Sequence, residues 1–160
     1  MTKTKNNKKI LKFKFLEHTA DVKFQAFGKT IEKAFGNSAL AMAETMTKGE
    51  KVAPPGVPSA GGTEKSFFVK GKDNESLLYG FLEEFLYLLD AEDFILSKVK
   101  KILIKDNVLK AIVIGDKASK YKFTNDVKAV TYNEMFVRVE KSRAKRKEED
   151  KFICQVVLDV

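Results

Sequence analysis

The amino-acid sequence predicts an α+β (α/β two-layer) fold, with two main helices packed on mainly antiparallel sheet. Two segments carry apolar residues at helical spacing, and several short segments alternate apolar and polar residues in the manner of half-buried strands. No unit repeats along the chain, which argues against a solenoid. With 160 residues, the chain is long enough to bury a sizeable core.

Both predicted helices follow a residue that can cap a helix. Thr30 precedes the first helix, and its hydroxyl can accept hydrogen bonds from the amides of the first turn. A single apolar stripe follows at spacings of three or four, formed by Ile31, Phe35, Ala39, Met42 and Met46. Asp73 or Asn74 opens the second helix, SLLYGFLEEFLYLLD, and its wide apolar face is expected to leave Glu83 and Glu84 solvated.

The remaining apolar segments predict strands. We expect them at Ile10–Leu16, Lys23–Phe27, Phe67–Val69, Val99–Ile104, Val108–Ile114, Val127–Val139 and Phe152–Leu158. Val52–Ser66 holds all three prolines and is expected to be an irregular surface loop, and Glu140–Lys151 a charged hairpin loop. Residues 1–9 are predicted to be a basic flexible tail, and residues 10–160 a single domain.

Composition narrows the class of protein. The net charge of +8 favours an anionic partner such as a nucleic acid or an acidic protein face. The single cysteine, Cys154, excludes a disulfide within the chain and a thiolate metal cluster, and its alternation with apolar neighbours indicates a buried structural thiol. No apolar run approaches the ~20 residues of a membrane span, and the lysine-rich start lacks the apolar core of a signal peptide. We therefore expect a cytoplasmic protein without a membrane partner.

Catalytic motifs are scarce in this sequence. There is no glycine-rich phosphate loop with its lysine, no G-x-G-x-x-G after a strand, and no pair of histidines for zinc. His18 is the only histidine, and no serine lies in a G-x-S-x-G elbow, so a nucleophilic triad is not indicated. The sequence predicts a protein that is not an enzyme.

Two short segments, HTAD and the final VVLDV, contain aspartates that are candidate site residues. HTAD at 18–21 is most simply a turn in which Asp21 or Thr19 accepts backbone hydrogen bonds. In the final VVLDV, Asp159 follows an apolar strand, and if Val160 ends the chain, its α-carboxylate lies beside the Asp159 carboxylate. Such anionic groups repel one another unless a proton or a cation intervenes, and oxygen ligands suit Ca²⁺ or Mg²⁺. Composition cannot show whether Asp21 reaches Asp159.

Four blocks in order give the sequence a family resemblance. HTADV with EKAF, LLYGFLEEFLYL, VKAVTYNEMFV and VVLDV together resemble the archease family, and the match covers nearly the whole chain from about Leu16 to Val160. The resemblance implies the archease-like fold, consistent with the predicted helices and strands. It also implies a protein cofactor that activates the GTP-dependent RNA-splicing ligase of the RtcB type. Such a cofactor promotes ligase guanylylation and multiple turnover in tRNA splicing.

The resemblance also implies roles for particular residues. It implies a divalent metal ion, Ca²⁺ or Mg²⁺, held by Asp21, Asp159 and an oxygen of Val160. It marks Lys128 as a functional residue that contacts the ligase or a phosphate, although a solvated strand lysine is an open alternative. His18 would orient the Asp21 loop through a hydrogen bond. Asn133 departs from the family pattern, which commonly has histidine after TY.

Three alternatives to the ligase activator remain open. The family resemblance also implies a chaperone-like effect on the specificity of a tRNA methyltransferase, and tRNA itself would then be contacted indirectly or weakly. The basic segment KSRAKRKEED favours an RNA-binding module, although its acidic residues make a solvated hairpin loop the simpler interpretation. A metal-dependent hydrolase acting alone is the third possibility.

Overall fold

A computed structural model of the chain describes residues 11–48, 62–141 and 150–160. Within these ranges it contains two long helices, seven strands and one short 3₁₀ helix. In chain order they are β1 (Phe13–Leu16), β2 (Val22–Gly28), α1 (Ile31–Thr47), β3 (Thr63–Lys70), α2 (Asn74–Glu92), β4 (Phe94–Lys105), β5 (Val108–Lys117), η1 (Ala118–Lys120), β6 (Ala129–Glu140) and β7 (Lys151–Asp159).

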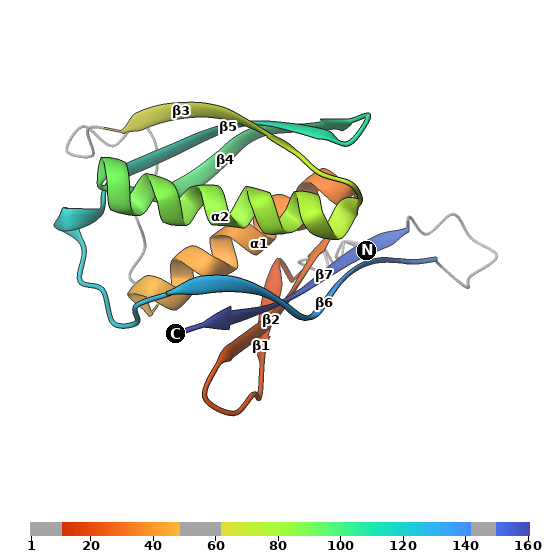
Figure 1. Cartoon of the computed structure of the whole chain (residues 1–160), viewed down its shortest axis with the longest axis horizontal. Coiled ribbons are helices and arrows are strands. Elements are labelled where there is room, and N and C mark those ends of the chain that lie inside the picture. Colours follow the sequence, from red (N-terminus) through yellow and green to blue (C-terminus); the bar gives the residue numbers. More distant parts are fainter. Residues whose placement is uncertain (1–10, 49–61, 142–149) are drawn as a thin grey trace, which may run out of the picture.

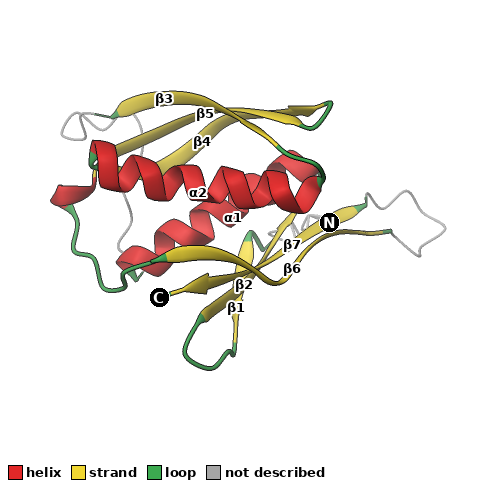
Figure 2. Cartoon of the chain, in the orientation of Figure 1, coloured by secondary structure: helices red, strands yellow, loops and turns green. Residues whose placement is uncertain are grey.

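The strands form two antiparallel sheets on either side of the helices. One sheet has the strand order β1-β2-β7-β6 and the other β3-β5-β4. Figure 1 shows α1 and α2 between the two sheets, and both helices contact strands of each sheet. The predicted fold class, two helices on antiparallel sheet, is confirmed (Figure 2). The division of the strands into two sheets was not predicted.

Helix α1 begins where the sequence predicts. The Thr30 hydroxyl accepts a hydrogen bond from the Lys33 amide at 3.1 Å, which satisfies one of the unpaired amides of the first turn. Gly28, at the end of β2, allows this close approach: a Cβ there would lie 2.4 Å from the Ala34 nitrogen. The strand can therefore turn directly into the helix only with glycine at this position.

Helix α2 begins with a reciprocal cap. Asp73 accepts from the Ser76 amide at 2.8 Å, while the Ser76 hydroxyl accepts from the Asp73 amide. The hydrogen bonds from Ser76 hold the pKa of Asp73 below its usual value. The cap thus identifies Asp73, and not Asn74, as the residue that opens the helix.

The expectation that Glu83 and Glu84 are solvated is wrong. Both residues are half-buried, and burial raises the pKa of Glu84. The Val130 amide of β6 donates to Oε1 of Glu83 at 3.3 Å, and the Val137 amide donates to Glu75 at the same distance. Because β6 is the outermost strand of its sheet, these carboxylates satisfy amides that have no neighbouring strand.

A chain of aromatic rings joins the helices to the smaller sheet. Phe81 of α2 is fully buried, and its ring centroid lies 6.1 Å from that of Phe35 in α1 and 6.0 Å from that of Phe67 in β3. Phe85 lies edge-on to both Phe81 and Phe67. These contacts form the part of the core that lies between α1, α2 and β3.

The smaller sheet is more extensive than predicted. Strand β3 begins at Thr63, whereas the sequence predicted only Phe67–Val69, because the polar residues Thr63–Ser66 lie on an exposed sheet edge. Strands β4 and β5 meet at a tight turn in which Asp106 and Asn107 both have positive φ angles of 52° and 59°. The turn joins the two strands that the sequence predicts at Val99–Ile104 and Val108–Ile114.

Several sequence predictions lie partly or wholly outside the described residues. They concern the tail at 1–9, most of the proline-rich loop and most of the Glu140–Lys151 hairpin loop. In the part of the chain that is described, no helix is long and apolar enough to cross a membrane.

Candidate functional site

The strand register brings the two acidic segments to one end of the four-stranded sheet. Val22 pairs with Leu158, and Ala129 pairs with Asp159. Asp21 directly precedes β2, while Lys128 directly precedes β6, and the Lys128 amide donates to the Asp159 carbonyl at 2.8 Å. Residues from three separate parts of the chain, including Val160, therefore meet at this end, which we call the carboxylate end.

The two aspartates lie at the same end of the β2–β7 pair. Val22, the first residue of β2, pairs with Leu158, and Asp21 and Asp159 are the next residues beyond this pair, with Asp21 just before β2 and Asp159 at the end of β7. Asp159 is exposed, and the Asp21 side chain is 34% exposed. Carboxylates that gather at one end of a sheet repel each other, so this end favours a cation or a basic partner.

His18 forms a hydrogen bond with the carboxylate of Glu134. Its Nε2 donates to Oε2 of Glu134 at 3.0 Å, whereas its Nδ1 lies 3.8 Å from Oδ2 of Asp21, beyond hydrogen-bonding distance. His18 Nδ1 is buried and has no hydrogen-bond partner among the described residues. His18 is thus held by a hydrogen bond to Glu134 and makes none to Asp21.

A bulge in β6 brings Glu134 to this position. Thr131 pairs with Val157, but the next paired residue of β6 is Phe136, opposite Gln155. Glu134 lies within the bulge with a positive φ of 54°, and the Gln155 side-chain amide donates to its carbonyl at 2.8 Å. The extra residues extend the chain across β7 toward His18 on the far side.

The Glu134 carboxylate is held in its charged form. The hydrogen bond from His18 and the positive charge of Lys23, whose Nζ lies 3.5 Å from Oε1, hold the pKa of Glu134 below its usual value. Sequence reasoning missed this residue, because its role depends on a bulge that no local pattern reveals. Asn133, which replaces the histidine of the family pattern, is the exposed residue just before it.

A metal ion would find a partial set of ligands here. Among the described residues, no three side chains of histidine, cysteine, aspartate or glutamate form a group that could hold a metal. Asp21 and Asp159 supply two carboxylates, so further oxygens would have to come from the main chain of Val160, from water or from a partner. That donor set suits a hard, oxygen-binding cation, and it does not suit zinc.

Cys154 is confirmed as a buried structural thiol. It is fully buried in β7, and burial raises the pKa of its thiol to about 12. At neutral pH the group is therefore a thiol and not the nucleophilic thiolate.

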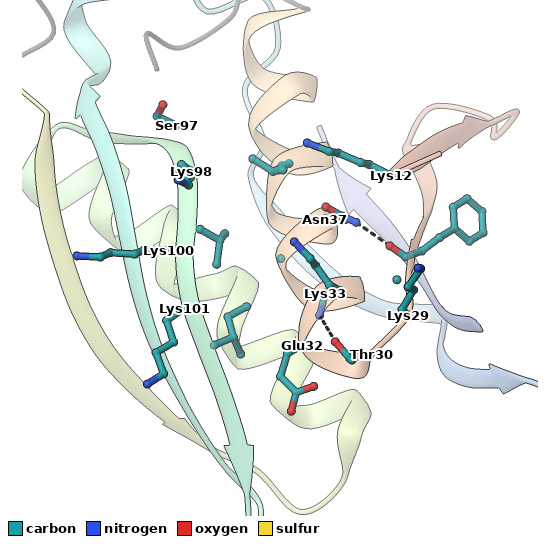
Figure 3. Close-up of a pocket in the computed structure, with 16 residues that line it drawn as sticks. Lys12, Lys29, Thr30, Glu32, Lys33, Asn37, Ser97, Lys98, Lys100 and Lys101 are labelled. Carbon is teal, nitrogen blue, oxygen red and sulfur yellow. Dashed lines mark hydrogen bonds between the residues drawn. The ribbon is translucent and has the colours of Figure 1, made fainter. Parts of the chain in front are cut away.

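A large cleft lies away from the carboxylate end. It measures about 810 Å³ and lies beside Gly28, at the opposite end of β2, between α1 and β4. Figure 3 shows Lys12, Lys29 and Lys33 on the α1 side and Ser97 to Lys101 on β4. Among the described residues that line it, Glu32 is the single carboxylate, and there is no histidine or cysteine. This cleft has the charge of an anion-binding surface.

Comparison with protein families matches nearly the whole chain. The Archease protein family (MTH1598/TM1083) matches residues 13–160. A Methanosarcina mazei protein named Protein archease is 36% identical over 155 residues, which cover 93% of this chain and 96% of that protein. Another protein of that name, from Pyrobaculum neutrophilum, is 40% identical over 132 residues, covering 79% of this chain and 85% of its own length.

A solved structure agrees with the fold. The solution structure of protein 1598 from Methanobacterium thermoautotrophicum superimposes with a TM-score of 0.67 at 31% sequence identity. The alignment covers 93% of this chain and 99% of that one. The similarity therefore extends over both sheets and both helices.

Proposed function

Because the chain belongs to the archease family, we propose that it activates a GTP-dependent RNA-splicing ligase of the RtcB type in the cytoplasm. It promotes guanylylation of the ligase and multiple turnover in tRNA splicing, and it catalyses no reaction itself. The observation that carries the proposal is the carboxylate end, where Asp21, Asp159 and Lys128 converge from separate parts of the chain. An effect on a tRNA methyltransferase stays a prediction from the sequence.

The position of these residues suits action on a partner. Asp159 and Lys128 are exposed at a sheet end, and the large cleft lies at the other end of β2. Side chains that protrude in this way can enter the nucleotide site of another protein, where charge is worth more than in water. Lys128 would contact a phosphate, while the aspartates would lie near the metal and nucleotide of the ligase.

We further propose that a divalent cation, Ca²⁺ or Mg²⁺, binds between Asp21, Asp159 and an oxygen of Val160. When bound, it supplies positive charge that offsets the two carboxylates and attracts phosphate oxygens. The protein residues position this site: the pairing of β2 with β7 sets the separation of the two aspartates. The contact between His18 and Glu134 holds the neighbouring loop, with His18 as a positioning residue.

Ligase assays with charge-neutral variants test the activator proposal. We expect Asp21→Asn and Asp159→Asn each to abolish most of the stimulation of guanylylation by the cognate ligase, because each removes one of the two carboxylates. Lys128→Gln should weaken stimulation as well. The matched control is Asp90→Asn, an exposed aspartate on α2, which should stimulate fully. Full stimulation by both Asp21→Asn and Asp159→Asn would overturn the proposal.

Calorimetric titration of the purified protein with CaCl₂ or MgCl₂ tests the cation separately. The wild-type protein should bind one ion, and Asp21→Asn should lose that binding while Asp90→Asn retains it. Absence of binding by the wild-type protein alone and with its ligase would contradict the cation proposal. The activator proposal would still stand on the ligase assay.

A further inference from the structure

The outer face of the three-stranded sheet is open to solvent. The helices cover the other face of β3, β5 and β4, as Figure 1 shows. In an antiparallel sheet, residues directly opposite one another share a face. The strand pairing therefore defines four rows across the outer face, in the order β3, β5, β4. These rows are Lys70–Val108–Lys105, Phe68–Lys110–Leu103, Ser66–Ile112–Lys101 and Glu64–Ile114–Lys98.

Lysine dominates the charge of this outer face. The rows hold five lysines, and a sixth, Lys100, reaches the face from the irregular segment of β4. Glu64 is the single carboxylate in the rows, and Lys100 already pairs with it at 2.8 Å. None of the five lysines in the rows has an ion-pair partner within the described ranges. The face therefore carries a large uncompensated positive charge.

The same face presents an aromatic ring to solvent. Phe68 is 64% exposed, and across the sheet Leu103 is 50% exposed. The preceding residue, Phe67, points the other way and packs against Phe81 and Phe85, so the core does not require an aromatic residue at 68. A hollow of about 310 Å³ lies beside Leu103 and Lys110. The surface thus offers an exposed ring, a hollow and unpaired lysines together.

We propose that this outer face binds single-stranded RNA. Residues on one face of a strand repeat every ~6.6–6.8 Å and neighbouring strands lie ~4.8 Å apart, so the lysines form a dense array for a chain of phosphates. An unstacked base can lie on the Phe68 ring, which is the common way in which proteins bind single-stranded RNA. Duplex RNA offers no splayed base to this ring, and the aspartate and glutamate side chains of an acidic peptide carry no aromatic ring to stack on it.

The cleft beside β4 extends the same positive surface. Figure 3 shows Lys100 and Lys101 directed away from α1, toward the outer face, although both also line the cleft. On the far wall of the cleft, Lys12 and Lys33 have no ion-pair partner among the described side chains. An RNA strand leaving the sheet at β4 would therefore meet further lysines. This inference concerns the smaller sheet and does not rest on the ligase proposal.

Fluorescence anisotropy with a labelled single-stranded RNA of about 12 nucleotides tests the electrostatic part. We expect the dissociation constant to rise with salt, and Lys101→Gln/Lys110→Gln to weaken binding. Each lost phosphate contact lowers the slope of log Kd against log salt by ~0.7, so the double variant should lower it by about 1.4. The matched control, Lys14→Gln/Lys48→Gln, removes the same charge elsewhere and should leave the slope nearly unchanged. Equal effects of the two double variants would overturn the proposal.

Variants of Phe68 test the stacking part in the same assay. Phe68→Leu keeps an apolar side chain and removes the ring, and we expect it to weaken RNA binding roughly tenfold, as loss of one stacked base does. Phe68→Trp keeps an aromatic ring at this position and should bind RNA about as well as the wild-type protein. Tyr87→Leu removes an exposed ring from α2 and should have no effect. If Phe68→Leu binds RNA as the wild-type protein does, the base-stacking role is wrong.

Competition experiments identify the class of ligand that binds the outer face. Unlabelled single-stranded RNA should displace the labelled strand at lower concentration than duplex RNA, poly-glutamate or vesicles containing anionic lipid, compared at equal charge. Displacement by poly-glutamate or vesicles at the same charge concentration would overturn the assignment to RNA and indicate an acidic protein or a membrane surface.

Discussion

Two phenylalanines at different depths give a quantitative test of the fold. Phe81 is fully buried and its ring contacts Phe35, Phe67 and Phe85, so Phe81→Ala removes apolar contacts and leaves a cavity. Such a change costs about 4 kcal/mol of unfolding free energy. Phe68 is 64% exposed, so only about a third of a ~2 kcal/mol transfer free energy, roughly 0.7 kcal/mol, is lost in Phe68→Ala.

Urea denaturation followed by circular dichroism measures both changes. For a chain of this length, 4 kcal/mol corresponds to a fall in Tm of about 8–16 °C, whereas 0.7 kcal/mol corresponds to only about 1–3 °C. The dependence of unfolding free energy on urea should be the same in all three proteins, which shows that the unfolded states are comparable. Equal destabilisation by the two substitutions would refute the assignment of Phe81 to the core and of Phe68 to an open face.

Three further predictions concern the carboxylate end, the Glu134 contact beside it and the buried thiol of Cys154. Glu134→Gln should lower Tm most above about pH 5, and the difference from wild type should vanish in acid. The His18 hydrogen bond lowers the pKa of Glu134 from 4.5, so the stability that the charged Glu134 contributes is lost as pH falls through that lowered pKa. Without divalent ions, Asp159→Asn should raise the unfolding free energy by about 0.2–1 kcal/mol, since it removes repulsion from Asp21; a lower value would contradict this. Cys154 should react with a thiol reagent only after denaturation, because its pKa is about 12 in the folded protein, and rapid labelling at neutral pH would contradict its burial.

Local patterns in the sequence predicted the helices well. Thr30 and Asp73 cap α1 and α2 as expected, because capping depends on a side chain and an amide only three residues apart. The turn at Asp106-Asn107 was equally predictable, since both residue types tolerate positive φ. In each case the physical cause lies within a few residues of the chain.

Long-range pairing explains what the sequence did not reveal. Glu83 looked solvated because it lies opposite the apolar stripe of α2, yet it accepts a hydrogen bond from the edge strand β6. Glu134 reaches His18 only because a bulge in β6 extends across β7. The convergence of Asp21 and Asp159 depends in the same way on the register of β2 with β7. No pattern of neighbouring residues encodes these pairings.

The exposure of the Phe68 ring also could not be predicted from the sequence. In the sequence, Phe67 and Phe68 are equivalent apolar residues of a short strand, and only the sheet shows that one enters the core and the other faces solvent. The lysines that share its face come from three strands, so the sequence alone does not reveal that they cluster. The proposed RNA-binding face therefore exists only once the three strands are paired in the folded sheet.

The most direct test of the central claim is a double-mutant cycle at the carboxylate end, read out as the rate of ligase guanylylation. If Asp21 and Asp159 act as one site, Asp21→Asn/Asp159→Asn should reduce stimulation no further than either single variant does. Thermal unfolding of each variant would show that the fold is retained. Losses that multiply in the double variant, or stimulation unchanged in all three, would contradict a shared site at the end of the four-stranded sheet.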